Sequence, residues 1–82
     1  MTKITILTSP GCHTCETTKD ILNDLEPEYN LEIEEIDITS DQGQKLAKTH
    51  YITAAPGILI NGELFSSGPV TEQQLRNELD TL

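Results

Sequence analysis

The feature that most constrains the fold is a pair of cysteines placed between a short apolar segment and a helix-forming one. Cys12 and Cys15 are the only cysteines among 82 residues, and two residues separate them. The apolar, β-branched run Lys3–Leu7 predicts a strand, and the segment Thr8–Gly11 (Thr-Ser-Pro-Gly) is a turn signal. The residues from Glu16 onward favour a helix. We therefore expect a strand, a tight turn and a helix whose first turn carries both thiols.

A thiol in the first turn of a helix is chemically activated. The unpaired N–H groups and the dipole at a helix N-terminus favour negative charge, so a thiol ionises there more readily than a free one. The thiolate is the nucleophile in disulfide exchange, and a second thiol one turn further on can capture the mixed disulfide. The motif predicts a reversible dithiol/disulfide site.

Metal binding is the alternative use of two close cysteines. Cys12, Cys15, His13 and His50 are all zinc-capable, although His13 lies between the thiols and is poorly placed to converge with both. An iron–sulfur cluster shared by two chains would use thiolates from each of them. A purely structural disulfide is disfavoured because a Cys-x-x-Cys bridge closes too short a loop to stabilise a fold much.

Length and charge limit the kinds of partner. A chain of 82 residues is expected to form one domain, residues 1–82, with a modest core. Its formal net charge is −9, from 14 acidic against 5 basic side chains. Nucleic acids and anionic membranes need a basic surface, so neither is expected as a partner. The acidic balance instead favours partners with positive surfaces.

Cysteine usage and hydropathy suggest where the chain works. No segment approaches the roughly 20 apolar residues of a membrane helix. The first strand begins almost at the N-terminus, which leaves no room for a secretory signal. We therefore expect a cytoplasmic location, where two close cysteines are more often catalytic or metal-binding than structural.

The middle of the chain predicts a helix, an edge strand and a second helix. The first helix is expected from Cys12 or His13 to Leu25, with Pro27 ending it. In the run Leu31–Ile38 acidic residues interrupt the apolar ones, and such charges are typical of an edge strand. A helix from Asp41 to about Lys48 follows, capped by Ser40 or Thr39, with a thin apolar face of Leu46, Ala47 and Tyr51.

The last third predicts a hairpin and a closing helix. The unbroken apolar run Ile58–Ile60 suits a central strand. Asn61-Gly62 is a strong hairpin signal and leads into an antiparallel strand, 63–67. Thr71 and Gln74 form a capping box, and the expected buried stripe of the final helix consists of Leu75, Leu79 and Leu82.

The predicted order β-α-β-α-β-β-α defines an α/β fold. The first half makes a right-handed βαβ unit with parallel strands, and the second half adds a hairpin and a helix. The simplest assembly is a four-stranded mixed sheet whose two faces are covered by the three helices. The cysteines then lie at the carboxyl end of the first strand, where ligands bind in open α/β sheets.

With this order, the chain resembles the thioredoxin superfamily, and within it the small glutaredoxin-like thioredoxins. The resemblance rests on Pro10–Cys15 after a strand, on Ala55-Pro56 before the apolar strand, and on the Asn61-Gly62 hairpin, and it covers nearly the full length. It implies a thioredoxin fold in which Pro56 is cis and packs beside the disulfide. The backbone of Ala55 is then expected to position an extended substrate chain.

The resemblance also implies a mechanism. Exposed Cys12 attacks and the more buried Cys15 resolves the mixed disulfide, in a reversible two-electron exchange with protein or small disulfides that needs no bound cofactor. Independently of the resemblance, His13 next to Cys12 is expected to stabilise the thiolate by its charge, and the alternative is an exposed polar residue that contributes little. The alternatives are a dedicated electron donor, for example to ribonucleotide reductase, or a non-enzymatic metal, iron–sulfur or redox-sensing module.

Departures from the two best-known relatives bear on the reductant. Gly11 stands where thioredoxins have Trp, and the strand Lys3–Leu7 has no carboxylate to assist Cys15. The segment Ser67–Pro69 replaces the Gly-Gly-x-Asp turn of glutaredoxins, and only Lys3 and Lys19 are bases near the expected groove. We therefore expect a thioredoxin-reductase-like flavoenzyme, rather than glutathione, to be the reductant. The expected oligomeric state is a monomer.

Overall fold

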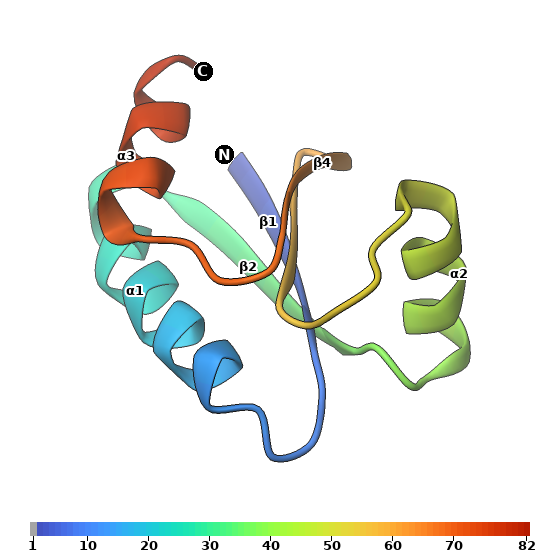
Figure 1. Cartoon of the computed structure of the whole chain (residues 1–82). Coiled ribbons are helices and arrows are strands. Elements are labelled where there is room, and N and C mark those ends of the chain that lie inside the picture. The colour runs from blue at the N-terminus through green and yellow to red at the C-terminus, as the bar shows by residue number, and fades with distance from the viewer. Residues whose placement is uncertain (1) are drawn as a thin grey trace.

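The computed structural model describes residues 2–82 and contains seven elements in the predicted order (Figure 1). They are β1 (Thr2–Thr8), α1 (His13–Tyr29), β2 (Leu31–Asp37), α2 (Asp41–His50), β3 (Gly57–Ile60), β4 (Glu63–Ser67) and α3 (Glu72–Asp80). Within the described residues, none of the helices combines the length and apolar character that a bilayer span requires.

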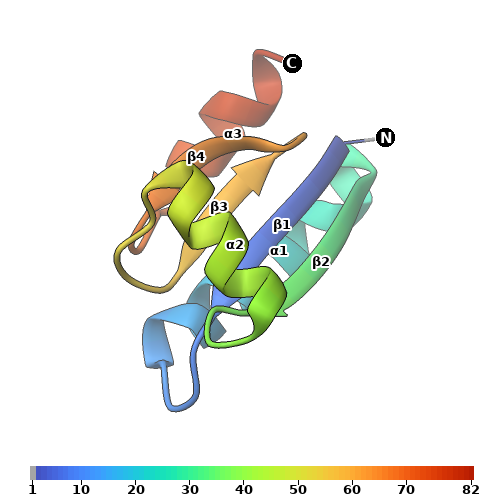
Figure 2. The ribbon, with the colours of Figure 1, turned by 90° about the vertical axis from the view of Figure 1, so that its right-hand side faces the viewer.

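The four strands form one mixed sheet in the order β2-β1-β3-β4. β1 runs parallel to β2 and antiparallel to β3, and β4 pairs antiparallel with β3. α1 and α3 cover one face of this sheet and α2 covers the other (Figures 1 and 2). The predicted fold class is confirmed, and β2, as predicted, is an edge strand.

Each face of the sheet has its own apolar core. The larger core lies between the sheet and the α1/α3 pair, and it includes Ile4, Ile6, Ile58 and Leu22, all fully buried. The smaller core lies under α2 and consists of Leu7, Ile36, Ile52 and Leu59. Successive strand residues point to opposite faces, so the β1 run Ile4–Leu7 supplies both cores. This double burial fixes β1 in the interior of the sheet.

The prediction that Pro27 ends the first helix is wrong, because α1 continues to Tyr29. Proline lacks the N–H that an interior turn needs, but tertiary contacts hold the two residues that follow. Glu28 accepts two hydrogen bonds from Arg76 on α3, and the Tyr29 hydroxyl donates to Asp80 at 2.8 Å. Asn30 then closes the helix in the left-handed conformation.

Gly43 lies within α2 despite its low helix propensity, because it has a packing role there. α2 begins after the Ser40 cap, whose hydroxyl accepts from the Gly43 N–H at 3.0 Å. A Cβ on Gly43 would overlap the backbone at Asp37 and Ile38. Glycine therefore lets the start of α2 approach the end of β2 closely.

The hairpin and the closing helix follow the prediction except at the last residue. Asn61 and Gly62 both have positive φ, as a tight two-residue hairpin turn requires, and the Thr71–Gln74 capping box is present. Leu75 and Leu79 are buried. The prediction for Leu82 is wrong, since α3 ends at Asp80 and the Leu82 side chain is 62% exposed.

Candidate functional site

The cysteines lie at the junction between β1 and α1. β1 ends at Thr8, the chain turns through Gly11 with φ +72°, and α1 begins at His13. Cys12 is the N-cap of α1 and forms a disulfide with Cys15. Figure 1 shows this loop at the end of the molecule opposite to both termini. The site therefore occupies the carboxyl end of an interior strand, as predicted.

The two sulfurs have different surroundings. Cys12 is partly exposed, whereas Cys15 is only 2% exposed because it shares the buried face of α1 with Thr18, Leu22 and Leu25. The backbone N–H of Cys15 donates to Cys12 Sγ at 3.1 Å. Cys12 is thus the accessible sulfur, and it accepts one of the N–H groups that a helix N-terminus leaves unpaired.

A second segment, distant in sequence, lies at the same edge of the sheet. Gly57 on β3 pairs with Leu7 on β1, so the preceding Ala55-Pro56 lies beside the end of β1. The Ala55–Pro56 peptide bond is cis, which confirms that expectation, and the Pro56 side chain is fully buried. The Pro56 carbonyl accepts from the Gly68 N–H at 2.7 Å. The substrate-positioning role of Ala55 and Pro56 stays a prediction.

The two residues between the cysteines differ in what they contact. The His13 side chain is exposed and makes none of the hydrogen bonds found in residues 2–82, so its tuning role stays a prediction. Thr14, for which the sequence predicted no role, places its Oγ1 3.3 Å from Cys12 Sγ. The sequence offered one signal for this contact. A cysteine at the N-cap directs its sulfur toward the first turn of the helix, where Thr14 lies.

A polar cluster flanks the loop before Cys12. The Thr8 hydroxyl donates to Glu35 on β2 at 3.0 Å, and Lys19 on α1 approaches the same carboxylate at 3.2 Å. A hollow of about 410 Å³ here is lined by Thr8–Pro10, Glu35 and Asp37. This flank of the site is therefore acidic, and the Lys19 charge is already paired.

The other residues considered for ligands lie apart from the dithiol. Lys3 is at the opposite end of β1 and pairs with Glu34 at 3.6 Å. His50 is the last residue of α2, on the other face of the sheet from α1. Within residues 2–82, no group of three or more His, Cys, Asp and Glu side chains is arranged to hold a metal ion.

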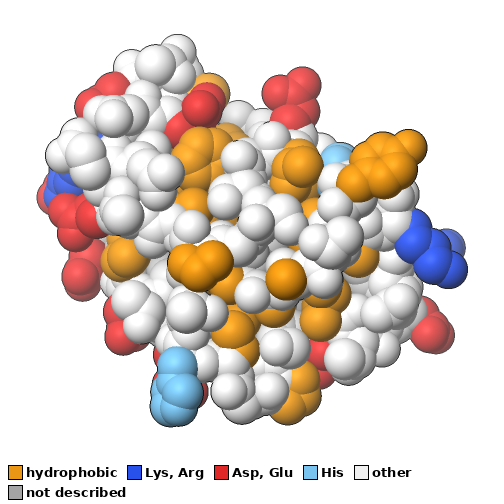
Figure 3. All heavy atoms as spheres, in the orientation of Figure 1, with side chains coloured by type: hydrophobic (Ala, Val, Ile, Leu, Met, Phe, Trp, Pro, Cys, Tyr) orange, Lys and Arg blue, Asp and Glu red, His pale blue; other side chains and the backbone are white. Residues whose placement is uncertain are grey.

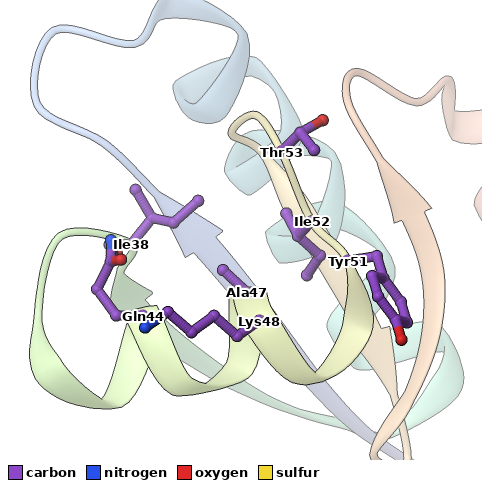
Figure 4. A pocket seen from close by; sticks show the side chains of 7 residues that line it. All are labelled: Ile38, Gln44, Ala47, Lys48, Tyr51, Ile52 and Thr53. Atoms are coloured by element: carbon purple, nitrogen blue, oxygen red, sulfur yellow. Dashed lines mark hydrogen bonds between the residues drawn. The ribbon is translucent and has the colours of Figure 1, made fainter.

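An apolar hollow on the surface is separate from the cysteines. It has a volume of about 620 Å³, lies beside α2, and has Ile38 and Tyr51 toward its two ends with Ala47 and Ile52 between them (Figure 4). Tyr51 does not join the buried face of α2 as expected, because its left-handed backbone turns the ring outward and leaves it 87% exposed. Neither cysteine lines this hollow, and the dithiol stays the candidate site.

Fold and site together define a thioredoxin-like protein with a Cys-x-x-Cys disulfide. The model of the glutaredoxin-like domain family (DUF836) matches residues 3–80, and the chain belongs to this family. No curated protein sequence matches the chain. The family and the disulfide together support a redox role.

Solved structures confirm the fold. Thioredoxin O2 from Arabidopsis thaliana in its oxidised state aligns with a TM-score of 0.77 at 16% identity, over 100% of this chain and 75% of that one. Oxidised mitochondrial thioredoxin 3 from Saccharomyces cerevisiae aligns with a TM-score of 0.74 at 19% identity, over 99% and 78%. The NTD_N/C domain of alkylhydroperoxide reductase AhpF from Enterococcus faecalis aligns with a TM-score of 0.78 at 28% identity, over 95% of this chain and 37% of that one.

Proposed function

We propose that the chain is a thiol–disulfide oxidoreductase that reduces disulfides in proteins or small molecules. The observation that carries the proposal is the pairing of an accessible sulfur with a buried one. Cys12 is partly exposed at the N-cap of α1, and Cys15 is 2% exposed and bonded to it. A structural disulfide has no need of an accessible sulfur at a helix N-terminus, whereas a nucleophile does.

The reaction proceeds by two displacements at sulfur. In the reduced protein the Cys12 thiolate attacks one sulfur of the substrate disulfide, forming a mixed disulfide, and the other substrate sulfur leaves as a thiolate that takes a proton from solvent. Cys15 then loses its proton to solvent and attacks Cys12 Sγ. This step forms the internal disulfide and releases the second substrate sulfur. Two electrons pass to the substrate, and no bound cofactor takes part.

An external dithiol must restore the reduced form. A flavoenzyme of the thioredoxin-reductase kind is the proposed donor, because the ammonium groups of Lys3 and Lys19 are both within 4 Å of carboxylates and the flank of the site is acidic. The acidic flank and the pairing of both lysines disfavour binding of an anionic tripeptide such as glutathione. Such a cycle needs a reducing compartment, so the cytoplasm is the proposed location. A monomer is the proposed oligomeric state.

Substrate chains are proposed to dock along the segment before β3. Ala55 is half-buried and lies beside the end of β1, next to the fully buried Pro56. An extended peptide that pairs with this backbone would bring its disulfide toward Cys12, in the way that peptides add to a strand edge.

Disulfide reduction by the purified protein tests the proposal. Wild-type protein in the presence of dithiothreitol should accelerate insulin reduction, and Cys12→Ser should be inactive. Thr17→Val, a change on the exposed face of the same helix, is the matched control and should keep the wild-type rate. Equal rates for wild type and Cys12→Ser would refute the proposal. A parallel panel of reductants, the glutathione system against a flavoenzyme reductase, identifies the donor.

A second candidate is a dedicated electron donor to one acceptor protein. It is favoured by the 28% identity to a domain that is one part of an alkylhydroperoxide reductase. A dedicated donor should be captured in a mixed disulfide with a single protein, whereas a general reductase should capture many. Trapping with Cys15→Ser, followed by mass spectrometry of the adducts, separates the two candidates.

A further inference from the structure

The Thr14 hydroxyl differs from those of the other threonines on α1. The Thr17 hydroxyl donates to the His13 carbonyl at 3.2 Å, and the Thr18 hydroxyl donates to the Thr14 carbonyl at 2.8 Å. Both follow the usual pattern in which a helical threonine bonds the carbonyl four residues earlier. The Thr14 hydroxyl instead lies 3.3 Å from Cys12 Sγ. Its partner is the sulfur that faces solvent.

The direction of this hydrogen bond follows from the chemistry of the sulfur. Cys12 Sγ carries no hydrogen in the disulfide, so the Thr14 hydroxyl is the donor. A thiolate also carries no hydrogen and is a stronger acceptor than a disulfide sulfur. The hydroxyl therefore donates to Cys12 in the oxidised protein, and a Cys12 thiolate at the same position would be a better acceptor for it.

Two donors converge on the same sulfur from the first turn of α1. One is the backbone N–H of Cys15 at 3.1 Å, which any residue at that position except proline would supply. The other is the Thr14 hydroxyl, which only serine or threonine would supply at this distance from the backbone. Of the two donors, only the Thr14 hydroxyl therefore depends on which residue occupies its position.

We propose that Thr14 is a positioning residue whose hydroxyl donates to Cys12 Sγ and stabilises the thiolate that attacks the substrate. The inference deepens the proposed function by assigning a group that sets the reactivity of its nucleophile. Stabilising the thiolate lowers the pKa of the Cys12 thiol and makes the internal disulfide easier to reduce. Through this contact Thr14 acts on Cys12 without touching the substrate.

Alkylation of Cys12 by iodoacetamide tests the assignment directly. The measurement uses a Cys15→Ala background, so that Cys12 is the only thiol, and follows the rate from pH 4 to pH 10. Thr14→Val keeps the shape and removes the hydroxyl. At pH values below the midpoint, where the rate follows the thiolate fraction, its rate should fall about three- to tenfold, because the thiolate loses one of its two donors while the Cys15 N–H and solvent partly compensate. The midpoint of the profile should move to higher pH.

Two further variants separate the hydroxyl from other effects. Thr14→Ser restores the donor and should restore the wild-type profile. Thr17→Val removes a hydroxyl that bonds the backbone and should leave the profile unchanged. Coincident profiles for wild type and Thr14→Val would overturn the proposal, and so would equal shifts in Thr14→Val and Thr14→Ser. Circular dichroism of each variant confirms that α1 is intact.

The same series distinguishes this inference from the proposed function. If Thr14→Val shifts the alkylation profile but wild-type protein reduces no disulfide, the Thr14 assignment stands and the proposed function fails. If wild-type protein reduces disulfides and Thr14→Val alkylates like wild type, the proposed function stands and the Thr14 assignment fails.

Discussion

Leu7 on β1 pairs with Gly57 on β3 in antiparallel register, and this pairing brings the cysteine loop after β1 close to the Ala55-Pro56 segment before β3. The chain that leaves β1 after Thr8 carries Cys12, and the chain that enters β3 at Gly57 carries Pro56. Both segments therefore lie at the same edge of the sheet although they are far apart in sequence. Because β1 and β3 are interior strands, the site depends on the integrity of the whole sheet.

Replacing Cys15 should stop the reaction at its midpoint. Cys15→Ser leaves Cys12 to attack but removes the thiol that resolves the mixed disulfide, so covalent adducts with substrates should accumulate. Non-reducing gels and intact-protein mass spectrometry measure the adducts, and dithiothreitol should release them.

The matched control for the trapping experiment is the complementary variant. Cys12→Ser keeps only the buried sulfur, which is 2% exposed, and should form almost no adduct. Equal trapping by the two variants would contradict the assignment of Cys12 as nucleophile and Cys15 as resolving thiol.

Removing His13 tests whether its charge acts on the dithiol through space. His13 is exposed and makes no hydrogen bond in the described part of the chain, so any effect on Cys12 must be electrostatic. His13→Ala should make the couple more reducing in low salt, and the effect should shrink in 1 M salt, where the Debye length is about 3 Å. Equilibration with a redox buffer of known potential gives the shift. An unchanged potential at low salt would make His13 a bystander.

Gly43→Ala should destabilise the fold even though alanine is the better helix former. The added Cβ would overlap the backbone at Asp37 and Ile38, and relieving that overlap moves α2 away from β2. Because the overlap is with backbone atoms, which cannot rotate away, we expect a cost near the upper end of the roughly 1–3 kcal/mol range for overpacking, and this exceeds the gain of about 1 kcal/mol in helix propensity. Urea unfolding measures the change.

The neighbouring exposed position supplies the control for Gly43. Gln42→Ala changes helix propensity on the same turn without adding a contact, and should leave the unfolding midpoint nearly unchanged. A Gly43→Ala protein as stable as wild type would show that α2 can shift without cost.

Local signals in the sequence predicted most elements because each depends on nearby residues. The Asn61-Gly62 turn and the Thr71–Gln74 capping box need only their own backbone and side chains, and both formed as expected. The Cys-x-x-Cys segment likewise lies at the start of α1, as its local sequence predicts. These features are encoded within a few residues, so pattern alone reveals them.

The features that sequence reasoning missed depend on partners elsewhere in the chain. α1 runs past Pro27 because Arg76 and Asp80 of α3 hold its last turn, and no local pattern shows those contacts. Gly43 is required by the backbone of β2 rather than by its own helix. The Thr14 contact depends on which way one hydroxyl turns, and that choice is visible only once Cys12 caps the helix.

The Arg76–Glu28 pair should make stability depend on pH in a defined direction. The two Arg76 N–H donors, at 2.7 and 3.2 Å, hold the pKa of Glu28 below its ordinary value of 4.5. A carboxylate with a lowered pKa in the folded state stabilises the fold above its unfolded-state pKa, and this contribution is lost as pH falls through the lowered value. Glu28→Gln should therefore be less stable than wild type at pH 7, with the difference closing below about pH 4.

Urea unfolding of Glu28→Gln and Glu26→Gln across pH 7 to pH 3 checks this assignment. Glu26 lies on the same helix and makes none of the ion pairs within residues 2–82, so its substitution removes an equal charge without breaking the contact to α3. Because the whole chain carries a net charge of −9, with acidic side chains spread around the face shown in Figure 3, losing either carboxylate also relieves general repulsion. Subtracting one series from the other leaves the contribution of the Arg76 contact. If the two series coincide at every pH, the contact does not hold the last turn of α1, and another interaction must explain why the helix continues past Pro27.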